Sequence, residues 1–451
     1  WAEQDGDEIV ASVLDAATQA VAALGADRVR LAAAGLASQR ASCVCWDRRD
    51  GRPLSPVFSW QDRRAHAWIG SMEAAHGDAV HRATGLFLSP HYGASKLRWA
   101  LDHLPAVRAA HEDGSLAWGP MASFLAFRLL RERPMLADPQ CAARTQLWNL
   151  GTRDWDPSLL ALFGLPAGHL PQSTHTVGHW GTFETQPRGR TPGTHPGDAP
   201  PRPGVAIPMR AVNGDQSAAV FAFGWPEADS AYVNIGTSAF VQRVTEAGGH
   251  VPRQLTGIIL DDGTRTLYTV EGNVNGAGAG LEWFAREFDV PSMERALPEW
   301  LSRPVDGVPL FLNGIAGLGG PFWQAEFDSR FVGEGDTAAK AVALVESIAF
   351  LLQANADHMA KYVAPMKRIR VSGGLSRIDG LCRALAALAG VPVLRRDDPE
   401  ASARGIAYLA AGYPGDWNSG AAEDVFAPVA DAALAARYQR WRALMAQATG
   451  V

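Results

Sequence analysis

Asp215 is the side chain in this sequence that is best placed to remove a proton from a bound molecule. It follows Gly214 and precedes a run of small and apolar residues that ends at Gly224. A glycine, a carboxylate and such a run together predict a tight turn at the start of a helix. There the carboxylate could act as a general base for a hydroxyl group. It could equally serve only to cap the helix, and the residues alone leave both interpretations open.

A second candidate for chemistry follows Asp215 along the chain. Ala231-Tyr232-Val233 is typical of a short strand, and it opens into the turn Gly236-Thr237-Ser238. Backbone amides and a hydroxyl group in such a turn can bind phosphate oxygens. An ordinary turn at the end of a strand would have the same composition. A candidate base and a candidate phosphate site therefore lie near the middle of the chain.

The elements that must position these residues alternate between strands and helices in both halves of the chain. We predict strands at 29–36, 42–46, 56–60, 231–234, 239–244, 257–260, 266–270, 369–372 and 391–393. We predict helices that begin at Gln61 and that cover 95–104, 124–130, 276–288, 337–362, 379–388, 401–412 and 429–448. The stretch 186–204 is rich in proline and glycine and predicts an irregular surface loop. The alternation predicts an α/β protein.

Length and composition narrow the function further. A chain of 451 residues exceeds one ordinary core, and we predict two domains, 1–225 and 226–451, with the boundary near Trp225-Pro226. The net charge of -6 argues against a nucleic acid or an anionic membrane as the main partner. The sequence shows neither a run typical of a transmembrane helix nor a secretory leader. Four cysteines without a CxxC pair predict buried, reduced thiols in a cytoplasmic protein, and no metal site.

Several segments, in order and over essentially the whole chain, resemble the FGGY carbohydrate kinases, a branch of the actin-like ATPase fold. The turns at Asp215 and at Gly236 resemble the connecting and second-phosphate motifs of that family. The other matching segments are Ser38-Gln39-Arg40, Trp60-Gln61-Asp62-Arg63-Arg64, Lys96-Leu97-Arg98-Trp99, Gly317-Leu318-Gly319-Gly320-Pro321-Phe322-Trp323 and Val371-Ser372-Gly373-Gly374-Leu375-Ser376. The motif set is most similar to that of glycerol kinases. The resemblance implies an α/β fold of two actin-like, ribonuclease H-like domains with a catalytic cleft between them.

The resemblance also implies which residues take part in phosphoryl transfer from ATP to a hydroxyl group. Asp215 would be the general base, and Mg²⁺ would be bound mainly through ATP oxygens and water. The nucleotide would contact Gly236, Thr237, Gly278, Glu282, Gly373 and Gly374. For Gly278, a role in packing alone remains an equal alternative.

The acceptor pocket of the family corresponds here to Arg40, Trp60, His91, Asp215, Gln216 and Phe240. Trp60 could also belong to an ordinary core. Four positions depart from glycerol kinases: Ala41 replaces a glutamate, His91 a tyrosine and Ala122 an aspartate, and Ile378 lies near where an asparagine is usual. Lost hydroxyl-binding groups weaken discrimination and enlarge a pocket. We therefore expect a polyol or ketose sugar larger than glycerol as the acceptor.

Two further interpretations stay open, namely a ketopentose kinase of the xylulokinase type and a sugar-binding pseudokinase. The chain opens at Trp1 with a segment that follows the first-phosphate hairpin, Asp-x-Gly-Thr, in the resembling family. We expect the natural protein to begin before Trp1 with that hairpin, and the given chain alone to show little kinase activity and poor solubility. Asp261-Asp262-Gly263-Thr264 is similar to the motif, but Asp-Gly between two apolar runs predicts a hairpin turn. We expect a homodimer or homotetramer that binds a small polyol or sugar and ATP.

Overall fold

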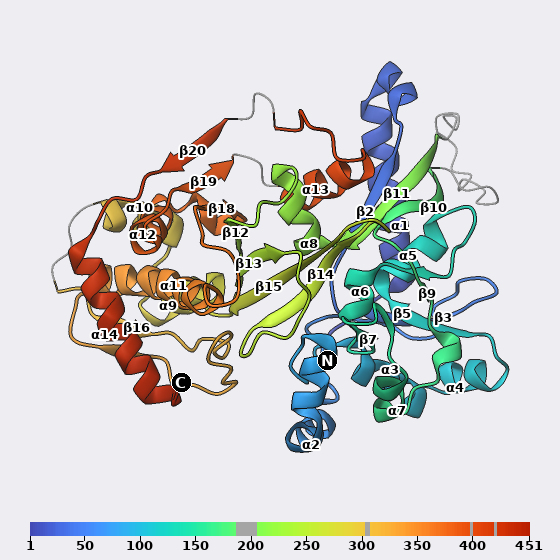
Figure 1. Cartoon of the computed structure of the whole chain (residues 1–451), viewed down its shortest axis with the longest axis horizontal. Coiled ribbons are helices and arrows are strands. Elements are labelled where there is room, and N and C mark those ends of the chain that lie inside the picture. Colours follow the sequence, from blue (N-terminus) through green and yellow to red (C-terminus); the bar gives the residue numbers. More distant parts are fainter. Residues whose placement is uncertain (186–204, 303–306, 397–399, 419–421) are drawn as a thin grey trace.

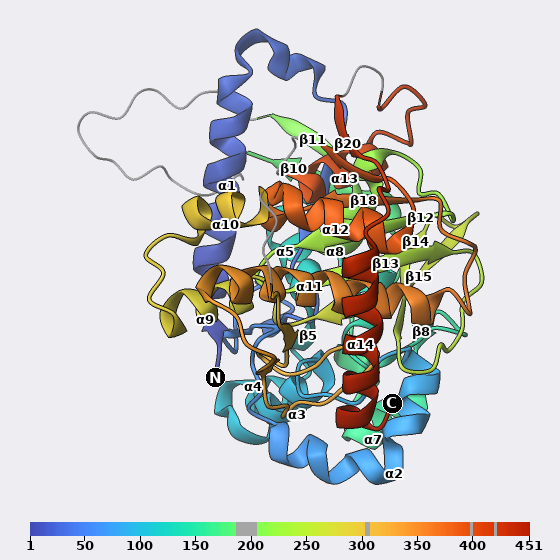
Figure 2. The same ribbon diagram turned by 90° about the vertical axis from the view of Figure 1, so that its left-hand side faces the viewer.

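The computed structural model describes residues 1–185, 205–302, 307–396, 400–418 and 422–451, and the predicted loop at 186–204 lies outside these ranges. The chain forms two α/β halves that meet around α8 (Figures 1 and 2). The elements of the first half are β1 (Glu3–Gln4), α1 (Gly6–Ala23), β2 (Ala34–Ser38), β3 (Cys43–Asp47), β4 (Val57–Phe58), α2 (His66–Thr84), α3 (Gly93–His103), α4 (Pro105–Glu112), β5 (Leu116–Pro120), α5 (Met121–Leu129), β6 (Leu136–Ala137), α6 (Pro139–Ala143), β7 (Trp148–Asn149), β8 (Asp154–Trp155), α7 (Pro157–Phe163), β9 (Gln172–Ser173), β10 (Val177–Glu184), β11 (Ala206–Gly214) and α8 (Asp215–Val220).

The second half alternates in the same way. Its elements are β12 (Ser230–Ile235), β13 (Ala239–Thr245), β14 (Leu255–Asp261), β15 (Thr266–Val274), α9 (Gly278–Glu287), α10 (Met293–Ser302), β16 (Leu310–Leu312), β17 (Arg330–Val332), α11 (Thr337–Met359), β18 (Arg368–Ser372), α12 (Asp379–Ala389), β19 (Val393–Arg396), α13 (Ala401–Ala410), β20 (Glu423–Phe426) and α14 (Ala432–Thr449).

Two sheets organise the first half of the chain. One has the strand order β10-β11-β2, with β11 parallel to β2, and the other has the order β1-β4-β3-β5. The strand predicted at 29–36 is displaced, because Gly25–Arg30 forms a 3₁₀ helix and β2 begins at Ala34. Val29 is 84% exposed, so this apolar side chain is not part of a core. The helix predicted from Gln61 begins only at His66.

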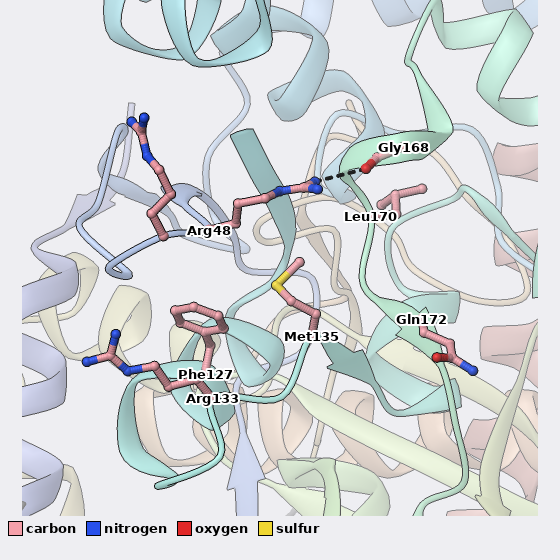
Figure 3. A pocket seen from close by; sticks show the side chains of 8 residues that line it. Arg48, Phe127, Arg133, Met135, Gly168, Leu170 and Gln172 are labelled. Atoms are coloured by element: carbon pink, nitrogen blue, oxygen red, sulfur yellow. Dashed lines mark hydrogen bonds between the residues drawn. The ribbon is translucent and has the colours of Figure 1, made fainter. Parts of the chain in front are cut away.

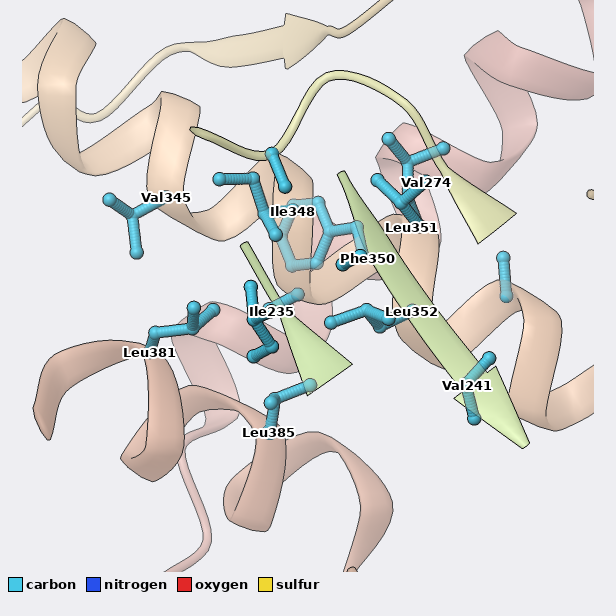
Figure 4. Packing of buried hydrophobic residues seen from close by; sticks show 14 of the residues in the cluster. Ile235, Val241, Val274, Val345, Ile348, Phe350, Leu351, Leu352, Leu381 and Leu385 are labelled. Atoms are coloured by element: carbon cyan, nitrogen blue, oxygen red, sulfur yellow. The ribbon is translucent and has the colours of Figure 1, made fainter. Parts of the chain in front are cut away.

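A seven-stranded sheet with the order β14-β15-β13-β12-β18-β19-β20 organises the second half. Helices α11, α12 and α14 contact one another on one side of this sheet (Figures 1 and 4). Leu351 and Leu352 of α11 and Leu385 of α12 pack with Ile235 and Val241 of the sheet. By length and composition, α11 is the described helix that could cross a membrane, but 83% of its apolar window is buried inside the protein, which is the signature of a core helix.

The two halves share a hydrophobic cluster around α8. Ala218 of α8 and Ile406 of α13 both belong to it, although they lie far apart in sequence. A Cβ atom at Gly405 would lie 1.8 Å from the carbonyl oxygen of Ala218, so only glycine allows α13 to approach α8 this closely. The helix that begins at Asp215 is therefore fixed by packing from both halves.

Two local predictions are confirmed by the structure. β14 and β15 form an antiparallel hairpin, and Gly263 in its turn has a φ of 82°, as the Asp-Gly sequence predicts. The four cysteines, Cys43, Cys45, Cys141 and Cys382, are buried and unpaired. Burial raises the pKa of the Cys43 and Cys382 thiols to about 11, so both stay protonated at neutral pH.

Candidate active site

The parallel pairing of β11 with β2 brings Asp215 close to Arg40. Gly214 is the register partner of Ser38, so the segments that follow these two residues leave the same end of the sheet. A Cβ atom at Gly214 would lie 2.1 Å from Gln140 Oε1 and 2.6 Å from Arg40 Cγ. The glycine before Asp215 is thus required for close packing of the site, and the carboxyl ends of the strands carry the functional side chains.

Asp215 is the first residue of α8, and Gly214 occupies the N-cap position. The Asp215 Oδ1 atom accepts a hydrogen bond from the backbone N–H of Gln216 at 2.8 Å. Burial raises the pKa of the Asp215 carboxyl above its ordinary value, although the positive charge of Arg40 opposes this shift. A carboxylate with a raised pKa at the start of a rigid helix is a suitable general base.

The Arg40 guanidinium is held by a carboxylate that the sequence analysis did not identify. Arg40 Nη1 and Nη2 donate to the Glu271 carboxylate at 2.8 and 3.4 Å. Arg144 Nη2 donates to both oxygens of Glu271 at 3.2 and 3.1 Å, and Gln242 Nε2 donates at 3.0 Å. Burial alone would raise the pKa of Glu271, but Arg144 and Arg40 hold it at about 2. Glu271 is therefore ionised, and much of the donor capacity of Arg40 is already used.

Tyr92 also faces this buried cluster, next to the position that the family motif assigned to the acceptor pocket. Burial raises the pKa of the Tyr92 hydroxyl, and the charges of Arg144 and Arg40 partly oppose the increase. The neighbouring His91 turns instead toward Trp60, whose carbonyl oxygen lies 3.0 Å from His91 Nδ1. Of these two adjacent residues, it is Tyr92 that reaches the arginines.

Lys96 joins Trp60 and His91 to the segment that carries Arg40. Its fully buried ammonium donates to the carbonyl oxygens of His91 at 2.6 Å, Ser59 at 2.7 Å and Ala41 at 3.3 Å. Lys96 thus fixes three loops around the acceptor side, while Trp60 stays 45% exposed and is not a core residue.

Phe240 and Gln216 complete the acceptor side on the other flank of Arg40. The Phe240 ring centroid lies 5.9 Å from the Arg40 guanidinium carbon. The Gln216 Oε1 atom is buried and has no hydrogen-bond partner within the described part of the chain. A buried acceptor without a partner is costly, so a hydroxyl group bound at this position would satisfy it.

The predicted phosphate turn rests on the start of α9. The N–H of Gly278 donates to the carbonyl oxygen of Gly236 at 3.0 Å, and the N–H of Ala279 donates to that of Thr237, also at 3.0 Å. A Cβ atom at Gly278 would lie 2.8 Å from the Gly236 oxygen. The structure thus gives Gly278 a packing role beneath the turn. Glu282 lies one turn further along α9 and is exposed.

The predicted adenosine turn lies at the same end of the same sheet. β18 pairs in parallel with β12, so that Ser372 is the register partner of Asn234. Gly373 has a φ of 87°, and a Cβ atom there would lie 2.6 Å from the Ile235 carbonyl oxygen. A Cβ atom at Gly374 would meet no atom within 4 Å, so its backbone is open to a ligand. The two glycine turns are adjacent, as one nucleotide would require.

One of the four positions that depart from glycerol kinases lies in the hydrophobic core. Ala122 on α5 is 1% exposed and belongs to the hydrophobic cluster that also contains Val44 and Trp46. It lies in the core, so an alanine there does not enlarge the acceptor pocket. Ile378 is the half-buried residue that precedes α12.

A separate cavity of about 510 Å³ lies on the surface of the first half, away from these residues (Figure 3). Its lining consists of Arg48, Arg49, Phe127, Arg133, Met135, Gly168, Leu170 and Gln172. Arg48 donates to the Gly168 carbonyl oxygen across it at 2.9 Å, and none of the predicted site residues lines it.

Sequence and structure comparisons assign the two halves to known domains. Residues 1–193 match the N-terminal domain, and residues 231–412 the C-terminal domain, of the FGGY family of carbohydrate kinases. The chain is 34% identical over 466 residues to the glycerol kinase of Bordetella parapertussis, with 98% of this chain and 88% of that protein covered. It is 33% identical over 430 residues to the glycerol kinase of Deinococcus radiodurans, with 93% and 82% covered. The domain boundary near Trp225-Pro226 stays a prediction.

Solved structures show the same architecture. Plasmodium falciparum glycerol kinase with ADP gives a TM-score of 0.86 at 20% identity, with 100% of this chain and 90% of that chain covered. Xylulose kinase from Lactobacillus acidophilus gives 0.78 at 20% identity, with 99% and 91% covered. The predicted α/β fold with two actin-like ATPase domains is confirmed. The chain therefore belongs to the FGGY family of carbohydrate kinases, which are phosphotransferases with an alcohol group as acceptor.

Proposed function

We propose that this kinase phosphorylates a polyol or ketose with a longer carbon chain than glycerol, with ATP as the donor. The observation that carries the proposal is Ala41, which follows Arg40 in a turn with a φ of 60° and is only half-buried. A methyl group there offers no acceptor to a substrate hydroxyl and leaves the space of a longer side chain free. An acceptor with additional carbons could occupy that space.

The remaining groups on this side suit a polyol backbone. The unpartnered Gln216 Oε1 can accept one hydroxyl proton, and the exposed Trp60 offers an apolar wall to the carbon face of the substrate. In the reaction, Asp215 accepts the proton of one hydroxyl group while its oxygen attacks the γ-phosphorus of ATP and ADP leaves. The turns at Gly236 and Gly373 would bind the phosphates and the adenosine.

Mg²⁺ would neutralise the phosphate charge that develops during transfer. No cluster of three or more His, Cys, Asp or Glu side chains able to bind a metal ion occurs among the described residues. The ligands of this ion would come mainly from ATP oxygens and water, as is usual for Mg²⁺ at phosphates. We also propose a cytoplasmic protein, which the buried free thiols support, and a homodimer or homotetramer, which light scattering would test.

Glycerol is the second candidate acceptor, because both relatives compared above are named glycerol kinases. The two candidate acceptors differ in the side chain that they favour at position 41. Under the first, an added carboxylate would hinder the substrate, whereas under the second it would restore a missing contact.

An ADP-release assay with glycerol, erythritol, xylulose, ribulose and heptuloses decides between the candidates. We expect glycerol to give a kcat/KM at least about tenfold below that of the best acceptor, since one or two lost polar contacts account for this much. The Ala41→Glu variant should shift preference back toward glycerol, and Ala41→Gln controls for size without charge. If glycerol gives the highest kcat/KM for the wild-type protein, the proposal is wrong.

A further inference from the structure

Four charged groups, three of them with buried side chains, meet where the two halves of the chain face each other. Arg40 and Arg144 come from the first half and Glu271 from β15 of the second, and all three side chains are less than 10% exposed. The fourth group is Asp215. Two guanidiniums and two carboxylates make the cluster neutral when all four are ionised, and removing Glu271 alone leaves the two arginines that it bonds without their partner.

Within this cluster, Arg40 is bonded to one carboxylate and not to the other. Its two hydrogen bonds go to Glu271, at 2.8 and 3.4 Å. No hydrogen bond or ion pair joins Arg40 to Asp215 in the described ranges, although its charge acts on that carboxyl. Glu271 is itself fixed by Arg144 and by Gln242 on the neighbouring strand, so it cannot follow Arg40 toward Asp215.

The direction in which Arg40 is held matters for the chemistry. An opposite charge within about 4–6 Å lowers the pKa of a carboxyl by about 1–3 units, and a weaker base removes a hydroxyl proton less well. If Arg40 paired directly with Asp215, it would also compete with the acceptor hydroxyl for the same oxygens. An Arg40 anchored elsewhere leaves those oxygens free.

We propose that Glu271 is a positioning residue for phosphoryl transfer, which holds the Arg40 guanidinium beside Asp215 and not on it, so that this carboxylate remains free to accept the proton of the acceptor. The inference rests on the proposed role of Asp215 as the general base. Glu271 lies on β15, which pairs with β13 through Gln242, and β13 follows the Gly236-Thr237 turn. The same residue therefore links the acceptor arginine to the half that carries the phosphate turn.

The charged and titratable groups near Asp215 determine what a test can measure. Arg40 approaches it from the end of β2, Glu271 from β15, and the thiol of Cys141 from α6. Arg144 and Tyr92 lie behind Glu271. Replacing Glu271 by glutamine removes a negative charge and also frees Arg40 to move onto Asp215. Both changes lower the pKa of Asp215 and act in the same direction.

The pH dependence of kcat separates this role from a purely structural one. It would be measured with ATP and whichever acceptor gives the wild-type protein its highest kcat/KM. In the plot of kcat against pH, we expect the acid limb of the Glu271→Gln variant to lie about one pH unit or more below that of the wild-type protein. Its kcat on the plateau should fall by about tenfold. Glu271→Asp retains the charge and should restore most of the wild-type profile.

The double variant Glu271→Gln/Arg144→Gln keeps the cluster neutral, so it covers the case in which Glu271→Gln alone does not fold. It should show the same shift, whereas Arg144→Gln alone leaves Arg40 on Glu271 and should keep the wild-type limb. A folded double variant with an unshifted limb would overturn the proposal. An equal shift in Arg144→Gln alone would also overturn it. The assays would use the protein with its natural N-terminus, and inactivity of that protein on every acceptor would instead count against the proposed function.

Discussion

Asp215→Asn should separate catalysis from stability at the start of α8. Asparagine has the same shape, so its Oδ1 can still accept the 2.8 Å hydrogen bond from the Gln216 N–H and the helix should begin unchanged. Asparagine cannot take up the acceptor proton. A positioned general base contributes about 10²–10⁴ in rate, so kcat should fall by at least about 100-fold, or about 2.7 kcal/mol in activation free energy.

The stability of this variant should change in the opposite direction. Burial raises the pKa of Asp215, so its ionisation is less favourable in the folded protein than in the unfolded chain. Neutral asparagine removes that cost. We therefore expect a Tm equal to or above that of the wild-type protein, with ATP binding unchanged and only a small effect on the KM of the acceptor.

Steady-state ADP release, calorimetric ATP binding and thermal unfolding test the prediction on one preparation. Peptide mass spectrometry would exclude deamidation back to aspartate. Asp215→Ala is the matched control, because it loses the side-chain hydrogen bond as well as the base. If Asp215→Asn retains a kcat within about tenfold of wild type, Asp215 is not the base, whatever its stability.

Two further predictions follow from the described contacts. Gly278→Ala should destabilise the protein by about 1–3 kcal/mol in chemical denaturation and raise the KM for ATP, because the new Cβ would lie 2.8 Å from the Gly236 oxygen. Gly374→Ala is the stability control, because a Cβ at that position meets no atom within 4 Å. A Gly278→Ala protein with unchanged stability and unchanged KM for ATP would contradict the prediction. The pKa of Glu271 is about 2 in the folded protein, against 4.5 ordinarily, so its ionisation stabilises the fold by about 3 kcal/mol above pH 4.5, and this stabilisation is lost as the pH falls toward 2. Acid titration followed by circular dichroism should therefore show a shallower loss of stability for Glu271→Gln than for the wild-type protein. Parallel titration curves for the two proteins would refute the prediction.

Long, regularly patterned elements could be predicted from the sequence, because local periodicity determines them. The helix expected at 337–362 is α11, Thr337–Met359, and the strand expected at 369–372 is β18, Arg368–Ser372. The start of β2 could not be predicted in this way. Its position depends on pairing with β11, where Ala34 lies opposite Met209, a contact far away in sequence. The exposed Val29 suggested a strand only because its neighbours are apolar.

In the candidate site, too, some residues could be predicted from the sequence and others depend on the tertiary structure. Motif order placed Arg40 and Asp215, and the register of β2 with β11 explains why they lie together. The partner of Arg40 was missed, because Glu271 is 231 residues away in the chain. A signal existed, since Glu271 is a lone carboxylate in an otherwise uncharged strand, and a buried carboxylate in a sheet requires a partner. Which arginines would supply it is a property of the tertiary structure.

The general base and the phosphate turn lie on different halves of the chain, so the buried pair of Arg40 and Glu271, which joins the halves, bears on catalysis. Asp215 directly follows β11 of the first half, and the Gly236-Thr237 turn is fixed by the first amides of α9 in the second half. The distance from the acceptor oxygen to the γ-phosphorus therefore depends on how the halves approach each other. Arg40, bonded to Glu271 across that interface, belongs to the acceptor side but is held by the phosphate side. Any relative movement of the halves must change this bond, so acceptor binding and phosphate positioning are physically connected through it.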